Sequence, residues 1–326
     1  MIHSNTSHLC DKEATLNFYE KRYAQGYMDE WPIEKKLRIY EVIRSSKLPD
    51  RGEALDFGCG NGILTDVMRS ALPPRWKVYG TDISKTAIEN AQKRYPECIF
   101  FILDNHEFRD KKFSFLFTHH VLEHVYNLSE VMKEMCTRLH NESMMLHILP
   151  CGNEGSFEHN LCLLRDNGID RQFENRFFFE DEGHVRRLTT EQLTKLCHSY
   201  GFTLDTEYYS NQYHGAIDWI TQSDPNFLRL LTETNHAVNK KAKKTLKKIR
   251  RHLFLIWCLR YPTRFEEEKL KKTTKTTREK ILLTLAMPLY LFSKPLDNYF
   301  KRKSINEWTQ YKYDRSGSEM YLFYTR

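Results

Sequence analysis

The segment Ala54–Met68, ALDFGCGNGILTDVM, decides the fold of this chain. It begins with apolar, strand-like residues that carry Asp56, continues through three glycines at alternate positions, and ends in an amphipathic helical pattern. Glycine has no Cβ and tolerates positive φ, so a ligand can lie directly against the backbone. The segment therefore predicts a strand, a tight glycine turn and a helix that together form a ligand site.

The spacing of the glycines indicates which ligand this turn binds. Dinucleotide-binding turns have the pattern G-x-G-x-x-G, which holds a pyrophosphate at a helix N-terminus. Here the third glycine comes one residue early, and Ile63 stands where the motif requires glycine. Asp56, two residues before the first glycine, would also repel a pyrophosphate. A cationic ligand fits better, and S-adenosylmethionine carries both an ammonium and a sulfonium group.

Three further strand-like segments follow with polar residues at their ends. Val78–Ser84 ends in Asp82 and Ile83, about twenty residues after the last glycine, where an acid can bind both ribose hydroxyls. Ile99–Asn105 ends in Asp104 and Asn105, which we expect to meet the adenine edge. Phe113–Val125 runs into a histidine-rich end, in which His119 is expected to contact the cofactor.

In order and spacing, these four motifs resemble those of class I S-adenosylmethionine-dependent methyltransferases. The resemblance covers roughly Tyr40–Tyr209 and the last few residues. It implies an α/β fold, a doubly wound, Rossmann-like seven-stranded sheet with a largely helical insertion before the last strand, and S-adenosylmethionine as cofactor. The residues expected to bind this cofactor are Asp56, Gly58, Cys59, Gly60, Asp82, Ile83, Asp104, Asn105 and His119.

The alternation of strands and helices agrees with a parallel, doubly wound sheet whose ligands bind at the carboxyl ends of the strands. Ser84 and Ser129 are expected to cap the helices that follow the second and fourth strands. Thr189 and Gln192 form a capping-box pattern that opens a later helix, and Gly201 is expected to end it.

This pattern suggests four regions along the chain. Residues 1–50 form a helical leader, whose aromatic residues in Tyr19–Tyr23, with Tyr27 and Trp31, either pack over the cofactor, as the resemblance implies, or belong to a plain flanking helix. Residues 51–209 form the cofactor-binding core, with a polar, aromatic lid insertion at 151–188 above the active site. Residues 210–318 form a basic helical insertion, and residues 319–326 return as a final antiparallel strand.

Histidines are the candidate catalytic residues, because methyl transfer to oxygen requires a group that takes the acceptor's proton. His184 lies in a G-H-x-R-x-x-T segment similar to those of methyltransferases of this type, which favours it as base, with His124 as second choice. Arg186 and Arg187 could hold an anionic part of the acceptor. In the alternative interpretation His184 caps the helix and both arginines face solvent.

The same histidine-rich segment is also a candidate metal-binding site. His120-x-x-Glu123-His124 is similar to the E-x-x-E-H segment of ubiquinone-pathway O-methyltransferases, whose side chains bind a divalent ion. Here a histidine replaces the first acid, a set better suited to zinc or manganese than to magnesium. The segment V-L-E-H-V also occurs in methyltransferases without metal, so we expect no metal.

The charge of +7 is unevenly distributed. His236–Lys303 contains twenty Lys and Arg but five Asp and Glu, so the remainder of the chain is net acidic. Within this region, Lys240–Tyr261 and Lys280–Phe300 combine basic and apolar residues, as interfacial helices do, and residues 240–303 could contact an anionic membrane surface. Alternatively, their apolar faces pack on the core or on a second subunit. Nucleic acid is the less favoured partner, because no RNA-binding motif accompanies the basic residues.

The remaining signals concern location. The first residues lack a basic-then-apolar signal, and no apolar run is long enough to cross a bilayer. The eight cysteines show no paired pattern. We therefore expect a cytoplasmic enzyme, with the membrane inner face as a peripheral site.

Together these features predict an S-adenosylmethionine-dependent methyltransferase that O-methylates a small or membrane-associated acceptor, such as a saccharide, a lipid-linked intermediate or a quinone-like phenol. An RNA methyltransferase that uses the basic insertion is one alternative. A non-catalytic methyltransferase-like module that binds a membrane or a partner is the other.

Overall fold

The computed structural model describes residues 12–172, 174–271 and 276–326 and divides the chain into two compact units. Among the described residues, unit 1 contains 12–150, 181–207 and 320–326, and unit 2 contains 151–180 and 208–319. The segment expected as a lid insertion, 151–188, is therefore divided. Residues 181–188 belong to unit 1, because they are hydrogen bonded to it, as described below.

Unit 1 contains the large sheet. Its strands are β1 (Arg51–Phe57), β2 (Arg75–Asp82), β3 (Ile99–Ile102), β4 (Phe113–His119), β5 (Leu139–Pro150), β8 (Thr203–Ser210) and β9 (Glu319–Thr325). Its helices are α1 (Lys12–Ala24), α2 (Ile33–Ser45), α3 (Ile63–Ala71), α4 (Lys85–Arg94), α5 (Leu128–Thr137) and α7 (Thr190–Ser199), with a short 3₁₀ turn at His106–Phe108.

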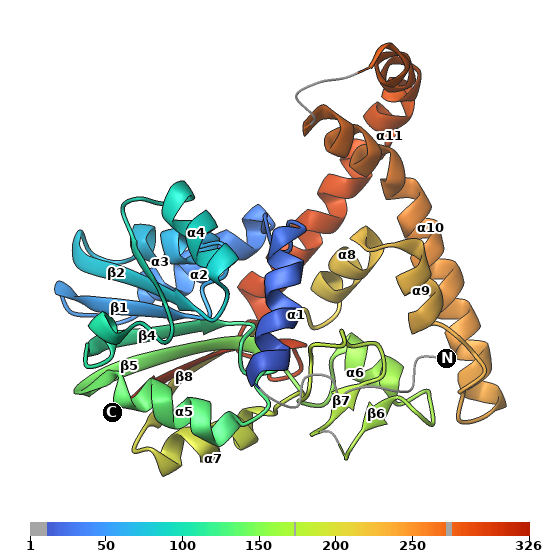
Figure 1. The fold of residues 1–326 in the computed structure, drawn as a ribbon. Coiled ribbons are helices and arrows are strands. Elements are labelled where there is room, and N and C mark those ends of the chain that lie inside the picture. The colour runs from blue at the N-terminus through green and yellow to red at the C-terminus, as the bar shows by residue number, and fades with distance from the viewer. Residues whose placement is uncertain (1–11, 173, 272–275) are drawn as a thin grey trace. The chain divides into compact units, whose positions relative to one another are not determined.

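The seven strands lie in the order β3-β2-β1-β4-β5-β9-β8, with β1 and β4 side by side in the middle (Figure 1). β1 pairs in parallel with both β2 and β4, and β4 pairs in parallel with β5. β9 runs antiparallel to β5, because Ser318 accepts a hydrogen bond from Cys151 while Arg326 donates one to Ser143. The strand order reverses between β1 and β4, which is the place where a doubly wound sheet binds ligands. The predicted fold class is confirmed.

Short-range sequence signals determine most helix starts in unit 1. Ser84 caps α4 by accepting the Ala87 N–H, and Thr189 and Gln192 form the predicted capping box of α7. Gly201 has φ +83° just after α7, as expected for a helix stop. The prediction of Ser129 as a cap is wrong. Asn127 caps α5 instead, and Ser129 lies inside the first turn.

Unit 2 is mainly helical. Its elements are α6 (Phe157–Cys162), β6 (Ile169–Asp170), β7 (Arg176–Phe177), α8 (His214–Gln222), α9 (Pro225–Leu231), α10 (Lys240–Lys271) and α11 (Thr277–Tyr311). Its core is aliphatic and joins α6, α8, α9 and α10 through Leu161, Ala216, Ile217, Ile220, Leu228, Leu231, Leu246, Leu253 and Ile256. The apolar block within Lys240–Tyr261 thus supplies core residues, in agreement with the alternative in which this segment packs on the protein.

Two polar clusters tie α11 to the rest of unit 2. Glu307 accepts the backbone N–H groups of Tyr213, His214 and Gly215, which places a carboxylate at the N-terminus of α8. Nearer the start of α11, Asp297 pairs with Arg260 of α10, and the Arg260 guanidinium is completely buried. Arg260 also donates to Asp218 at 2.7 Å and to the Thr221 hydroxyl at 2.8 Å.

The buried ion pair predicts a large stability difference between two neighbouring variants. Asp297→Ala should destabilise unit 2 by about 3–5 kcal/mol, because it leaves Arg260 buried with a carboxylate missing. Lys301→Ala removes the partly exposed partner of the same acid and should cost less than about 1 kcal/mol. Urea unfolding followed by tryptophan fluorescence measures both values. Equal losses in the two variants would contradict the assignment of Arg260–Asp297 as the main stabilising pair.

Candidate functional site

In the turn after β1, both the backbone conformation and close packing require glycine. Gly58 and Gly60 have φ values of +81° and +50°, which disfavour other residues. A Cβ at Gly58 would lie 2.5 Å from Val121, and one at Gly60 would lie 2.7 Å from the Tyr23 hydroxyl. The backbone N–H groups of Gly58 and Cys59 both donate to the Thr81 carbonyl, so the turn is fixed to the end of β2.

Two buried carboxyl groups lie beside this turn. Asp82 accepts hydrogen bonds of 2.9 Å from the backbone N–H groups of Gly60 and Ser84. Asp56 accepts a hydrogen bond of 2.6 Å from the Thr65 hydroxyl. Burial raises the pKa of Asp56 to about 7, and burial also raises the pKa of Asp82 above its ordinary value. Two acids held this way in a buried site would be stabilised as carboxylates by a cationic ligand.

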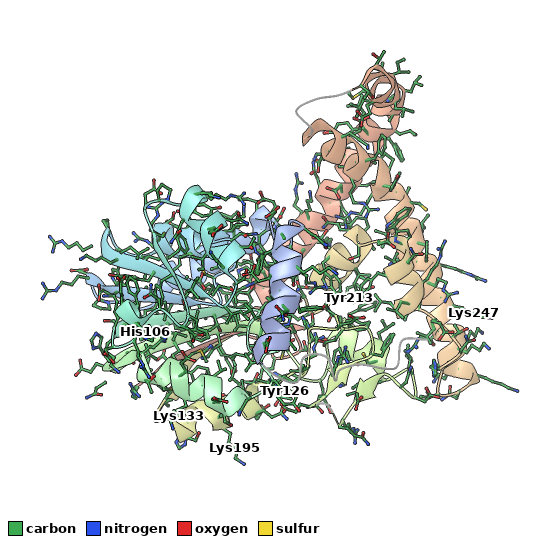
Figure 2. The ribbon with its side chains drawn as sticks, in the orientation of Figure 1. His106, Tyr126, Lys133, Lys195, Tyr213 and Lys247 are labelled. Atoms are coloured by element: carbon green, nitrogen blue, oxygen red, sulfur yellow. The ribbon has the colours of Figure 1, made fainter. Side chains whose placement is uncertain are left out.

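A cavity of ≈ 510 Å³ opens over the turn and both acids. Its volume lies within the range of small-molecule binding sites. Its wall on the side of the leader is aromatic and comes from Tyr19, Tyr23, Tyr27 and Trp31. These residues lie on α1 and in the connection to α2, and Figure 1 shows α1 crossing one end of the sheet. Tyr126, labelled in Figure 2 and exposed, contributes from the loop before α5.

Hydrogen bonds attach the leader to the cofactor-binding motifs. Glu20 accepts the backbone N–H groups of Lys85 and Thr86 at the start of α4. Asn61, inside the glycine turn, donates to the Tyr27 carbonyl and to Asp29. The sequence pattern predicts no role for Glu20 or Asn61. Their positions in the sequence were the only clue to these hydrogen bonds. That clue is weak, because acids on helices and asparagines in glycine turns are common without such bonds.

A second polar group surrounds Glu123, whose side chain has no exposed surface. His120 Nδ1 lies 2.8 Å from Glu123 Oε1, and His124 Nε2 lies 4.0 Å from the same oxygen. Burial alone would raise the pKa of Glu123, but the imidazoles of His120, His124 and His184 lower it to about 2. Burial lowers the pKa of His124 to about 4, although Glu123 acts in the opposite direction. Near neutral pH, the Glu123 carboxylate is therefore ionised and the His124 imidazole next to it is neutral.

His124 connects this group to the cavity. It lines the cavity, and its Nδ1 lies 2.7 Å from the Tyr19 hydroxyl and 3.0 Å from the Gly183 carbonyl. The ring of His184 packs edge-on against His124, with ring centroids 4.6 Å apart. His184 itself is not among the residues that line the cavity. The two predicted catalytic histidines are thus neighbours, and His124 is the one that reaches the cavity.

Residues 181–187 are joined to unit 1 by their own hydrogen bonds. Val185 donates to the Glu123 carbonyl, and Arg22 of α1 forms an ion pair with Asp181. Arg186 is buried and donates to the carbonyls of Leu122, Val125 and Tyr126. The interpretation in which Arg186 faces solvent is wrong. Its guanidinium donates to backbone carbonyls, and Arg186 is not among the residues that line the cavity. Arg187 is buried as well.

Most residues expected to bind the cofactor line the cavity. They are Asp56, Gly58, Cys59, Gly60, Asp82, Ile83 and His119. Asp104 and Asn105 do not, whereas their neighbour Leu103 does. Asn105 instead caps the 3₁₀ turn after β3 by accepting the Glu107 N–H. An Asp-Asn pair at a strand end is compatible with a ligand contact and with a helix cap, and sequence alone does not distinguish the two.

The possible metal ligands are also rearranged relative to the sequence motif. Glu123, His124 and His184 each place one potential ligand atom within 4.8 Å of the others. The motif suggested His120 as the third member, but His120 has φ +53° and its Nδ1 is used on Glu123. His184, sixty residues along the chain, takes that place in the group. This relationship was not visible in the sequence.

The comparisons with known proteins define the class. A family model described as a methyltransferase domain matches residues 27–207, more than half of the chain. The chain therefore belongs to the methyltransferase-domain family, and it is a class I S-adenosylmethionine-dependent methyltransferase. A search of curated proteins found no match.

Several solved structures are similar to this chain. The magnesium protoporphyrin IX methyltransferase of Synechocystis PCC 6803, with bound S-adenosylhomocysteine, is 17% identical, with a TM-score of 0.45 over 62% of this chain and 95% of its own. YcgJ of Bacillus subtilis is 17% identical, with a TM-score of 0.44 over 64% and 86%. A putative methyltransferase in complex with the Trm112 activator of Haloferax volcanii is 11% identical, with a TM-score of 0.41 over 60% and 79%. These likenesses identify no acceptor.

Among the residues that the structure describes, no helix combines the length and the apolar character needed to cross a bilayer. The described cysteines are free thiols.

The buried Asp56 predicts an unusual dependence of stability on pH. An unfolded Asp ionises near pH 3.9, but folded Asp56 holds its proton until about pH 7, so its contribution to stability falls as the pH rises between these values. Asp56→Asn cannot ionise and should melt several degrees higher than the wild type at pH 8. This difference should shrink at pH 5.

Calorimetry with S-adenosylhomocysteine completes this test. Asp56→Asn should bind it at least about tenfold more weakly, because the ligand's ammonium loses a carboxylate. Asp66→Asn, which changes a partly exposed acid on α3, should alter neither the melting temperature at pH 8 nor the affinity for S-adenosylhomocysteine. An Asp56→Asn protein less stable than the wild type at pH 8 would show that the ionised carboxylate is needed for folding.

Proposed function

We propose that this enzyme O-methylates a small or membrane-associated acceptor, such as a saccharide, a lipid-linked intermediate or a quinone-like phenol. The observation that carries the proposal is His124, a partly exposed imidazole on the cavity wall that is neutral above about pH 4 and lies next to the ionised Glu123. An alcohol or phenol acceptor has to lose a proton when it is methylated, and this pair is suited to take it.

We further propose that Asp56, Gly58, Cys59, Gly60, Asp82, Ile83 and His119 hold S-adenosylmethionine. When bound, the cofactor supplies an electrophilic methyl group on its sulfonium. Two features support the fit. The glycine turn has bare backbone, because a Cβ at Gly58 or Gly60 would collide with Val121 or Tyr23. The buried Asp56 offers negative charge to the ligand's cationic groups, and Asp82 would accept hydrogen bonds from the ribose hydroxyls. We leave Asp104 and Asn105 out of this set, because they do not line the cavity.

In this proposal, His124 takes the acceptor's proton. Protonation would create an imidazolium whose Nε2 lies 4.0 Å from the Glu123 carboxylate. Because the Glu123 side chain has no exposed surface, the two opposite charges would stabilise each other strongly. The Tyr19 hydroxyl at 2.7 Å and the Gly183 carbonyl at 3.0 Å hold the imidazole in place. Burial raises the pKa of Tyr19, so its hydroxyl stays protonated at physiological pH. His184 then acts as a positioning residue that packs on the His124 ring.

The aromatic wall supports an acceptor with an apolar face. Tyr19, Tyr23, Tyr27 and Trp31 offer flat surfaces that pack well on a phenol ring or on the apolar face of a sugar. Because α1 carries part of this wall and is fixed to α4 by Glu20, the leader would fix the width of the site.

Exchange of His124 tests the proposed proton acceptor. His124→Asn should lower kcat/KM by about 10²–10⁴-fold, since that is the usual contribution of a general base. In the matched variant His184→Asn, kcat/KM should fall by less than about tenfold, because this exchange removes a packing contact and leaves the proposed general base in place. Transfer of tritiated methyl groups from S-adenosylmethionine to extracts of cells that lack the protein measures both. Unchanged calorimetric binding of S-adenosylhomocysteine shows that the site remains folded.

The pH profile gives an independent readout. The wild-type acid limb should fall near pH 4, the pKa of His124, well below the ordinary value of 6.5. A larger loss in His184→Asn than in His124→Asn would make His184 the base. Activity that is lost with a chelator and restored by zinc would assign Glu123, His124 and His184 to a metal, against this proposal. Methyl label recovered in RNA would favour the alternative of an RNA methyltransferase.

A further inference from the structure

The first half of α11 carries a row of exposed apolar side chains. Ile281, Leu285, Leu289 and Phe292 follow one another at the spacing of a single helix face, with Leu282 beside them. Their exposed fractions are 56%, 71%, 60%, 67% and 45% respectively. We call these five residues the α11 stripe. Contiguous exposed apolar patches of this kind mark interaction sites in soluble proteins.

The fold of unit 2 does not use this stripe. The other face of α11 packs on α10 through the buried residues Leu283, Ser293 and Asp297. Ser293 is hydrogen bonded to Thr263, and Asp297 pairs with Arg260. One face of α11 is therefore covered by α10, and the apolar face that carries the α11 stripe remains exposed in the described structure.

The character of the exposed face changes along the helix. After the α11 stripe come Pro295, Tyr299 and Arg302, all exposed and again at the spacing of one face. A groove of ≈ 580 Å³ lies at this end and is lined by Tyr290, Leu291, Lys294, Pro295, Asn298, Tyr299 and Arg302. The helix face thus presents apolar residues first, then tyrosine and then cations. Membrane proteins show the same order of side chains from the acyl region of a bilayer to its headgroups.

We propose that the face of α11 from Ile281 to Arg302 is a docking surface for an anionic lipid bilayer. The α11 stripe would enter the acyl boundary, and Arg302 beside the groove would meet lipid phosphates. Lys294, also beside the groove, is paired with Glu267. The segment 281–292 is about 18 Å long at 1.5 Å per residue, much less than the 30 Å of a hydrocarbon core. It can therefore lie in the interface but cannot span it, which agrees with the absence of a spanning helix among the described residues.

Bends within α11 fit this arrangement. Pro288 and Pro295 lie inside the helix, where proline removes a backbone hydrogen bond and bends the axis. Figure 1 shows the first turns of α11 directed differently from the remainder of the helix. This bend allows the apolar turns to follow a flat surface while the remainder of α11 takes a different direction.

Charge favours a lipid over a second copy of this chain. The α11 stripe is followed by Lys301–Lys303, of which Lys301 also pairs with Asp297. A parallel two-fold contact between two stripes would bring these basic residues of both copies close together. An anionic bilayer complements the same basic residues, each of which contributes attraction near the surface. The surface does not depend on the identity of the acceptor.

Vesicle flotation of the full chain tests this proposal. Wild-type protein should float with phosphatidylcholine vesicles that contain phosphatidylglycerol, and at least about tenfold less with phosphatidylcholine alone. The double variant Leu285→Glu/Leu289→Glu should lose at least about tenfold in vesicle affinity, because two buried apolar contacts are replaced by charges. Leu255→Glu is the matched control, since Leu255 is equally exposed but lies on α10. It should bind as the wild type does.

Two further measurements make the result decisive. Arg302→Glu should weaken binding to the anionic vesicles while leaving the weak binding to phosphatidylcholine unchanged. Calorimetric binding of S-adenosylhomocysteine should be unchanged in all variants, which shows that unit 1 is intact and separates this proposal from the proposed function. Flotation that is unaffected by the double variant, or equally reduced in Leu255→Glu, would overturn the proposal. A wild-type dimer in solution that the double variant converts to monomer would assign the stripe to a second copy instead.

Discussion

The structure of the site depends on the parallel register of β1 and β2. Phe57 pairs with Thr81, so both strands end at the same level of the sheet. Because of this register, the Thr81 carbonyl accepts the N–H groups of Gly58 and Cys59, and Asp82 accepts that of Gly60. The glycine turn cannot move without breaking these bonds. Two carboxyl groups are consequently held in a buried position, where a cationic ligand would stabilise their ionised forms.

The leader extends this constraint to the acceptor side. Glu20 is fixed at the N-terminus of α4, and Asn61 of the glycine turn holds the backbone of Tyr27. The aromatic wall is thus attached to the same elements that form the cofactor site. His124 lies where this wall meets the end of β4, with Tyr19 on one side and Glu123 on the other. Cofactor site and candidate base are therefore fixed by one network, which explains why a leader outside the central sheet contributes to a site that the sheet defines.

Unit 2 shows how two helices of similar composition serve different purposes. α10 places Leu246, Leu253 and Ile256 in the core, and Arg260 satisfies its buried guanidinium with Asp218 and Asp297. α11 shares that packing on one face but leaves the α11 stripe exposed on the other. Both helices are rich in basic and apolar residues, so composition alone suggested one shared role.

The sequence by itself determined the features that rest on neighbouring residues: the glycine turn, the acids at the ends of β1 and β2, the order of strands and helices, and the caps at Ser84 and Thr189. Hydrogen bonds over a few residues fix these, so a local pattern is sufficient. Only the tertiary structure decided that His184 packs on His124, that backbone carbonyls bind Arg186, that Asn105 caps a turn, and that α10 is buried where α11 is exposed. These outcomes depend on which groups, distant in sequence, become neighbours when the chain folds. The local sequence around a histidine, an arginine or an apolar helix is the same whatever its neighbour in the fold, so it does not predict that neighbour.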